Sequence, residues 1–125
     1  MNFPEDLKYT DTHEWVKLDG DVVTIGITEF AAGELGDVVF VDIPEARAVA
    51  TGESFGSIEA VKTVSDLIAP VAGTITEINP DLEGSPELVN SDPYGQGWMV
   101  KMAIDGVGEL DNLMDAAQYK QLIGK

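Results

Sequence analysis

The chain has 125 residues, of which 23 are acidic and 7 are basic, so its formal net charge is −16 at pH 7, and it has no cysteine. A surface this negative repels nucleic acids and anionic membranes, which favours partners with basic docking faces, although solubility alone would also explain the charge. The lack of cysteine excludes disulfides, thiol catalysis and cysteine metal sites, so any sulfur redox chemistry would require an attached cofactor.

The amino-terminal residues have neither the basic region nor the apolar region of a signal peptide, and no apolar run approaches the length of a membrane span. We therefore expect a cytoplasmic protein. The length fits one domain over residues 1–125, and 44% hydrophobic residues are enough for one core.

The amino-terminal third predicts a hairpin followed by a short helix. Residues 16–18 and 22–27 have β-type composition, and Asp19-Gly20 between them is a turn signal. Residues 28–35 predict a short helix, with Thr28 as its N-cap and Gly36 directly after its end.

The middle of the chain predicts four strands. Residues 38–43 are strongly β-branched and predict a buried strand. Residues 54–61 and 63–69 predict two strands that meet near Lys62, and residues 73–78 predict another before the turn signal Asn79-Pro80.

The last third begins with a stretch rich in Gly, Pro and Asp over residues 79–97, with one helical turn predicted at 86–89. Residues 98–104 predict a strand. Asp111 is the expected N-cap of a closing helix over residues 112–123, with its apolar face at Leu113, Ala116, Ala117 and Leu122. Many short strands with helices only at the flanks predict two packed antiparallel sheets or a partial barrel.

Lys62 stands out because it lies at a strand junction in a stretch that is otherwise poor in charge. A lysine at a tight hairpin would hold its amine in water, clear of the domain. Glu59 and Asp66 flank it along the chain, a pattern that an attaching enzyme could recognise. From its position alone, an ordinary solvated turn lysine is the better explanation.

Residues 56–73 resemble the lipoyl-attachment motif of glycine cleavage H proteins, in which a glutamate lies three residues before the modified lysine and a glycine eleven residues after it. Glu59 and Gly73 fill those places around Lys62. Ala60 stands where the family usually has serine, and Thr63-Val64 replaces small residues. Further blocks resemble the family in the right order, at residues 8–9, 13–16, 24–28, 35–41, 90–95 and 97–99.

The resemblance implies a mostly β, lipoyl-domain-like barrel-sandwich hybrid of two antiparallel sheets with short flanking helices, including a C-terminal helix. It implies a non-catalytic carrier with lipoate attached covalently to Lys62, which shuttles the aminomethyl group of glycine and reducing equivalents. It also implies a monomer whose partners are a pyridoxal-phosphate glycine decarboxylase, a tetrahydrofolate-dependent aminomethyltransferase, dihydrolipoamide dehydrogenase and a lipoate-attaching enzyme.

The resemblance also gives candidates for a cleft that shelters the loaded arm. Glu14 and Asp66 would hold its amine through charge-assisted hydrogen bonds, with Thr12 as a hydroxyl partner, although both carboxylates could instead be merely solvated. His13, the only histidine, is expected to be structural. Three alternatives stay open: a biotinyl carrier, whose lysine usually has methionine on both sides, a hydrolase that uses paired carboxylates, and a donor of lipoyl groups to other proteins.

Overall fold

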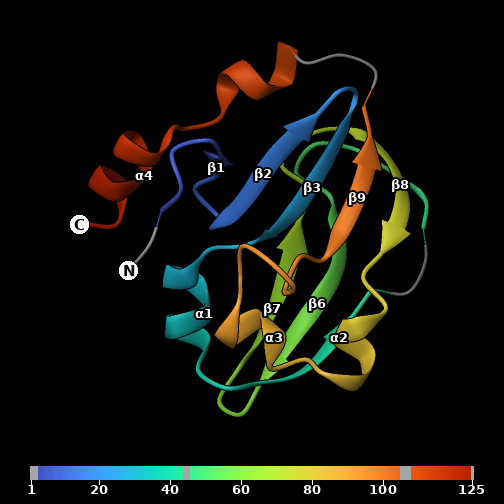
Figure 1. Ribbon diagram of the computed structural model, residues 1–125, viewed down its shortest axis with the longest axis vertical. Coiled ribbons are helices and arrows are strands. Elements are labelled where there is room, and N and C mark those ends of the chain that lie inside the picture. The colour runs from blue at the N-terminus through green and yellow to red at the C-terminus, as the bar shows by residue number, and fades with distance from the viewer. Residues whose placement is uncertain (1–2, 44–45, 105–107, 125) are drawn as a thin grey trace.

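The computed structural model describes residues 3–43, 46–104 and 108–124, and it contains two antiparallel sheets (Figure 1). The larger sheet has the strand order β1-β2-β3-β9-β8-β5, and the smaller one has the order β4-β6-β7. The larger sheet consists of β1 (Lys8–Tyr9), β2 (Glu14–Asp19), β3 (Val22–Ile27), β9 (Val100–Ala103), β8 (Gly73–Ile78) and β5 (Ala48–Val49). The smaller sheet consists of β4 (Val38–Asp42), β6 (Ser54–Ala60) and β7 (Val64–Ile68).

The main hydrophobic core lies between the two sheets. Ile25 of β3 and Ile75 of β8 come from the larger sheet, and Ile58 of β6 and Leu67 of β7 come from the smaller one; all four side chains are buried in one cluster. Alternating strand residues point to opposite faces, so each sheet contributes one face to this core. The predicted mostly β class with two antiparallel sheets is thus confirmed.

The predicted short helix is confirmed as α1 (Glu29–Leu35). The Thr28 side chain accepts a hydrogen bond from the backbone N–H of Ala31, which is the N-cap contact that the sequence predicts. Gly36 follows the helix with a φ of 79°, a conformation that favours glycine. In the preceding hairpin β2 extends to Asp19, so its turn begins one residue later than predicted.

The prediction of a buried strand at residues 38–43 is wrong about burial. The strand exists as β4, but Val39 and Phe40 are both 48% exposed. The register with β6 pairs Val38 with Ala60 and Phe40 with Glu59, which leaves Val39 as an extra residue. Such a bulge breaks the alternation of faces, so two consecutive apolar side chains reach the surface.

The closing helix starts later than predicted and buries a different face. It is α4 (Ala116–Leu122), and its N-cap is Asp115, which forms a reciprocal capping box with Gln118. Asp111 lies instead in the 3₁₀ helix η1 (Gly108–Asn112). Two short helices occupy the turn-rich stretch, an unpredicted α2 (Asp81–Gly84) and α3 (Leu88–Ser91), which is two residues later than the predicted helical turn.

Helix α4 packs beside β1 (Figure 1), and the two elements share a second cluster of buried side chains that is rich in aromatic rings. The rings of Tyr9 and Tyr119 are stacked with centroids 4.9 Å apart. The Tyr119 hydroxyl lies 2.8 Å from Nδ1 of His13 and 2.8 Å from Oγ1 of Thr28. These contacts join the C-terminal helix to the loop before β2 and to the N-cap of α1. The expected apolar positions Ala117 and Leu122 are exposed, and Tyr119 takes their place in the core.

Candidate functional site

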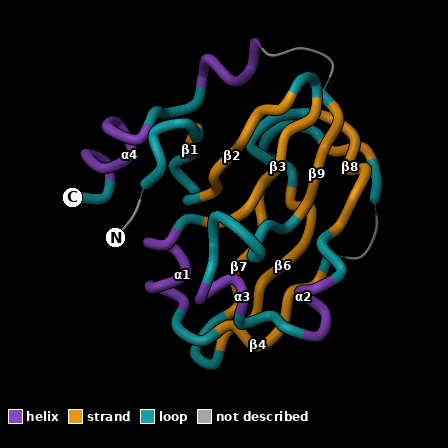
Figure 2. Tube along the Cα trace, in the orientation of Figure 1, coloured by secondary structure: helices purple, strands orange, loops and turns teal. Residues whose placement is uncertain are grey.

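Lys62 lies in the tight turn that joins β6 to β7, and this turn projects at the lower end of the molecule (Figure 2). The register pairs Glu59 with Val64, and the backbone N–H of Ala60 donates to the carbonyl of Thr63 at 2.8 Å, which closes the turn. A second bond, from the N–H of Val61 to the carbonyl of Asp37 at 3.1 Å, ties the turn to the residue before β4. The lysine therefore stands on a braced turn.

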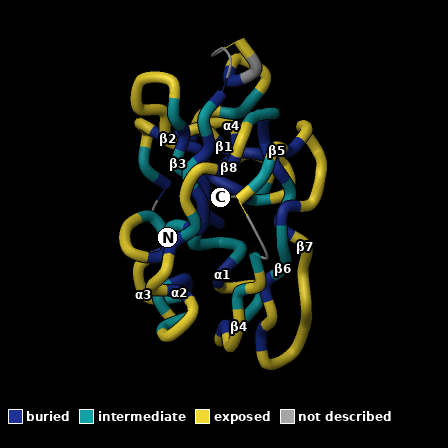
Figure 3. The backbone as a smooth tube through the Cα atoms, turned by 90° about the vertical axis from the view of Figure 1, so that its right-hand side faces the viewer, coloured by how far each residue is buried: buried dark blue, intermediate teal, exposed yellow. Residues whose placement is uncertain are grey.

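The hairpin is exposed along its tip and the first half of β7. Every residue from 61 to 66 is exposed, and Figure 3 shows this run along β7 toward the turn. The prediction that Lys62 projects into water from a tight hairpin is thus confirmed.

A cleft of about 210 Å³ lies between the two sheets beside this hairpin. One wall comes from the start of β2, another from β7 and a third from α1. The three residues that the sequence analysis proposed for an arm cleft, Thr12, Glu14 and Asp66, all line it. The remaining lining residues are His13, Ile27, Ala31, Glu34, Leu35, Ile58, Ser65 and Leu67.

Glu14 is a buried acid, with only 2% of its surface exposed. Its Oε1 accepts hydrogen bonds from the hydroxyls of Thr10, at 2.7 Å, and Thr12, and the N–H of Ile68 also bonds to the carboxyl. The backbone N–H of Glu14 in turn donates to Oγ1 of Thr10 at 3.0 Å. The carboxyl is therefore held in one orientation.

Burial raises the pKa of Glu14 from 4.5 to about 7, and the hydroxyl and amide donors oppose that rise only in part. Neither lysine nor arginine is among the residues that line this cleft. A carboxylate that is oriented, desolvated and without a cationic neighbour on the cleft wall can stabilise a small cation that enters.

Asp66 also lines this cleft, from β7, where it pairs with Ser57 of β6; it is exposed, and the pairing puts it on the same outer face of the smaller sheet as Val64. The cleft thus carries one buried and one exposed carboxyl on different sheets. Glu59 does not line it: this residue lies on the exposed face of β6 between Phe40 and Val64.

Gly73 does not lie near the hairpin turn in the fold: it is eleven residues after Lys62, at the start of β8 in the other sheet, where it pairs with Val49. A Cβ at this position would overlap the carbonyl oxygen of Ala103 and lie 2.8 Å from Cγ of Met102. Close packing of neighbouring strands therefore explains why a glycine is needed here.

Two residues of the site, Thr10 and Glu34, were not predicted from the sequence. Thr10 lies four residues before Glu14, and only the tight loop at residues 10–14 brings its hydroxyl to the carboxyl. His13 sits in that loop with a φ of 72° and lines the cleft. Burial lowers its pKa, opposed by the carboxylates of Asp11 and Glu34, and its bond to Tyr119 fits the structural role that was expected.

The described residues show neither a metal-binding cluster nor a membrane-spanning helix. No group of three or more His, Cys, Asp or Glu side chains within residues 3–43, 46–104 and 108–124 is arranged to hold a metal ion. None of the helices in those ranges combines the length and the hydrophobicity that a bilayer crossing requires.

The family model described as Glycine cleavage H-protein matches residues 7–125. The glycine cleavage system H protein of Staphylococcus carnosus is 57% identical over 126 residues and is covered over 100% of both chains. That of Bacteroides fragilis is 56% identical over 124 residues and 98% of both chains. The crystal structure of a glycine cleavage system H protein from Mycobacterium marinum matches with a TM-score of 0.89 and 42% identity, over 98% of this chain and 100% of that one.

Proposed function

The chain belongs to the glycine cleavage H-protein family, and we propose that Lys62 is the residue to which its lipoyl group is attached. The protein is a non-catalytic lipoyl carrier of the glycine cleavage system, and its fold is the barrel-sandwich hybrid of that family. It shuttles the aminomethyl group of glycine and reducing equivalents among the enzymes of the system. The single observation that carries the proposal for Lys62 is its exposure on the braced β6–β7 turn.

The residues around Lys62 fit an attached acyl arm. The hydrogen bonds of the turn use backbone groups, so acylation of Nζ breaks none of them. Acylation converts the ammonium into a neutral amide, and the exposed turn has room for the longer chain. When bound, the lipoyl group supplies a redox-active disulfide, which a chain without cysteine cannot provide. A flexible tether raises the effective concentration of its cargo at each partner's active site.

We propose that the cleft holds the aminomethyl group that the lipoyl arm carries. Glu14 accepts a hydrogen bond from an ammonium group and lowers its free energy by charge, while Asp66 adds a second, exposed carboxylate from β7. Thr12 holds the Glu14 carboxyl in place and offers its oxygen to the same amine. The apolar side chains of Ile27, Leu35 and Leu67 exclude water from the wall behind them, which slows hydrolysis.

We further propose which proteins this chain meets and in which form it acts. Its partners are a pyridoxal-phosphate glycine decarboxylase, a tetrahydrofolate-dependent aminomethyltransferase, dihydrolipoamide dehydrogenase and a lipoate-attaching enzyme. The chain acts as one domain and as a monomer in the cytoplasm. Glu59 and Gly73 serve the attaching enzyme as recognition features, Glu59 by its exposed charge beside the turn and Gly73 by allowing the close approach of β8 to Met102 and Ala103 of β9.

Intact-mass measurement tests the attachment site. The unmodified protein is incubated with lipoate, ATP and a lipoate-attaching enzyme, and we expect one lipoyl increment that peptide mapping places on Lys62. The variant Lys62→Arg keeps the positive charge and the fold but should gain no mass. A full increment on Lys62→Arg, or on any other lysine of the native chain, would overturn the proposal.

A further inference from the structure

Exposed hydrophobic side chains gather around Lys62. Six large hydrophobic residues are exposed in the described part of the chain, and four of them lie on β4 or on the β6–β7 hairpin. The exposed fractions of these four are 71% for Val61, 62% for Val64 and 48% for both Val39 and Phe40. We call these four residues the hairpin patch. Isolated exposed apolar residues need no explanation, but a cluster beside a reactive group marks an interaction site.

The strand register gathers these residues on one face. Phe40 of β4 lies opposite Glu59 of β6, which lies opposite Val64 of β7, so their side chains form one row across the exposed face of the smaller sheet. The bulge brings Val39 to the surface next to Phe40, and Val61 continues the patch into the turn. The hairpin patch therefore surrounds Glu59 and borders Lys62.

Acidic groups form the next row of the same face. Asp42 of β4 and Asp66 of β7 lie opposite Ser57 of β6, on either side of it. Neither β4, β6 nor β7 contains a lysine or an arginine. The two ion pairs among the described residues, Arg47–Glu53 and Lys101–Glu77, use none of these carboxylates.

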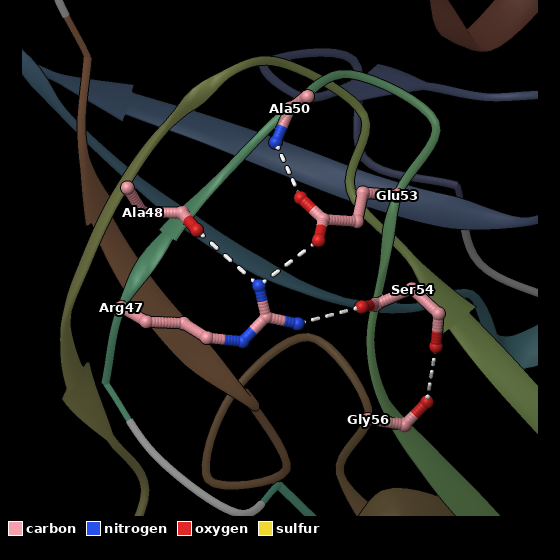
Figure 4. Close-up of polar contacts among 6 residues, drawn as sticks. All are labelled: Arg47, Ala48, Ala50, Glu53, Ser54 and Gly56. Carbon is pink, nitrogen blue, oxygen red and sulfur yellow. Dashed lines mark hydrogen bonds and ion pairs between the residues drawn. The ribbon is translucent and has the colours of Figure 1, made fainter.

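Arg47 is the basic residue that lines the hollow next to this row, together with Asp42 and Asp66. Its guanidinium is already engaged, as Figure 4 shows: Nη1 donates to Glu53 and to the carbonyl of Ala48, and Nη2 donates to the carbonyl of Ser54 at 2.9 Å. The acidic row therefore remains available to basic groups from another molecule.

We propose that the hairpin patch, with Glu59 and the acidic row beside it, is the surface on which the enzyme that acylates Lys62 docks. The matching surface of that enzyme is apolar and bordered by arginine or lysine, because the face it covers is apolar and bordered by carboxylates. This inference rests on the proposed attachment site at Lys62 and adds the surface through which the attaching enzyme recognises it.

The short reach of the unmodified lysine favours the acylating enzyme, over enzymes that act on the attached arm, as the partner that covers the hairpin patch. Before modification, Nζ stands at the end of a four-carbon stem, so an enzyme that acylates it must come within that distance of the turn. It then contacts Val61 and Val64, which flank Lys62 and are among the most exposed apolar residues described. Enzymes that act at the far end of an attached arm can stay farther from the hairpin.

The acylation reaction itself also requires the enzyme to approach the amine of Lys62 closely. The free amine of Lys62 attacks the carbonyl carbon of a lipoyl group that is activated as a mixed anhydride with a nucleotide phosphate. The amide N–C bond forms as the anhydride C–O bond breaks, the phosphate leaves with the bonding electron pair, and the amine releases one proton to solvent. No electron carrier is needed, so the docking surface only has to align the amine with the activated acyl group.

Acylation kinetics of the unmodified protein test the docking surface. Initial rates are followed by intact mass over a range of carrier concentrations for Phe40→Ser, Val64→Ser and the double variant. We expect the double variant to lose about tenfold in kcat/KM, mainly through a higher KM, because interface residues at the centre of a contact act on binding. The kcat/KM of the native chain should also fall as NaCl is raised, because the acidic row contributes to association.

Leu18→Ser is the matched control. Leu18 is 42% exposed and lies on β2 of the other sheet, so its kcat/KM should stay within about twofold of that of the native chain. Circular dichroism and extended incubation check that every variant is folded and can be acylated fully at Lys62. Equal kcat/KM values for the double variant and Leu18→Ser would overturn the docking surface while leaving the attachment site intact. A concentration-dependent dimer of the unmodified chain that Phe40→Ser abolishes would assign the patch to a second copy instead, which also contradicts the proposal.

Discussion

Replacing Glu14 by glutamine tests how its buried carboxyl group affects the stability of the protein. Glutamine has the same shape, and its Oε1 can accept the hydroxyl bonds of Thr10 and Thr12 that the carboxyl accepts now. It carries no charge at any pH. The variant therefore removes the cost of burying a carboxylate and leaves the packing of the side chain in place.

The pKa of Glu14 sets the size and the sign of the effect. Its rise from 4.5 to about 7 in the folded protein corresponds to about 3 kcal/mol of differential stability between the two charge states. Because the folded protein binds this proton more tightly than the unfolded chain does, the contribution of Glu14 to the unfolding free energy falls as the pH rises from about 4.5 to about 7. The native protein should lose up to about 3 kcal/mol relative to Glu14→Gln over that range.

Urea denaturation of both proteins at pH 5 and pH 8, followed by the fluorescence of the buried Trp15, measures this difference. The comparison between two proteins cancels the pH dependence that they share. Glu87→Gln, which removes one exposed carboxylate, controls for the change in net charge. If the difference in unfolding free energy between the native chain and Glu14→Gln is the same at both pH values, the buried-carboxyl argument is refuted.

Three further predictions concern the cleft, helix α4 and the packing of β8. On the loaded protein, Asp66→Asn should shorten the half-life of the glycine-derived one-carbon group several-fold, measured with isotope-labelled glycine. An unchanged half-life would mean that Asp66 does not help to hold the amine of the loaded arm. Tyr119→Phe deletes a hydroxyl with two side-chain hydrogen bonds and should lower the unfolding free energy by about 1–2 kcal/mol in urea titrations; a neutral effect would mean that these bonds contribute nothing. Gly73→Ala should destabilise the protein by more than about 2 kcal/mol, because the added methyl group meets the neighbouring strand. The control Gly84→Ala places its methyl group in open space and should be tolerated. Similar melting temperatures for the two variants would contradict the packing argument.

The sequence predicted the elements whose signals are local. The N-cap at Thr28 and the glycine that follows α1 are read from single residues with a fixed conformational preference, and both were confirmed. The two strands that meet near Lys62 were also predicted to within a residue at each end. In each case, residues close together in the chain determine the structure.

The wrong predictions have one tertiary cause and one that is partly local. A β-branched run predicts a strand but not a bulge, so the exposure of Val39 and Phe40 depended on the register with β6. Asp111 and Asp115 are both acceptable N-caps, and the capping box with Gln118 together with the packing of Tyr119 decided between them.

The candidate site likewise combines a local sequence signal with contacts that form only in the folded chain. Lys62 was identified from a motif of neighbouring residues, and its exposure was confirmed. Glu14 and Asp66 come from different sheets, so the resemblance to the family could name them but the sequence could not place them in one cleft. The raised pKa of Glu14 depends on burial by both sheets and is therefore a property of the folded chain alone.

The most direct test of the central claim follows the carbon of glycine to one residue. The lipoylated protein is incubated with glycine labelled at its methylene carbon and with a pyridoxal-phosphate glycine decarboxylase, and the digested protein is analysed by mass spectrometry. We predict that the label appears only on the peptide that contains Lys62, together with the lipoyl increment. A label on any other peptide, or a lipoylated Lys62 that never acquires label while the decarboxylase is active, would contradict the account.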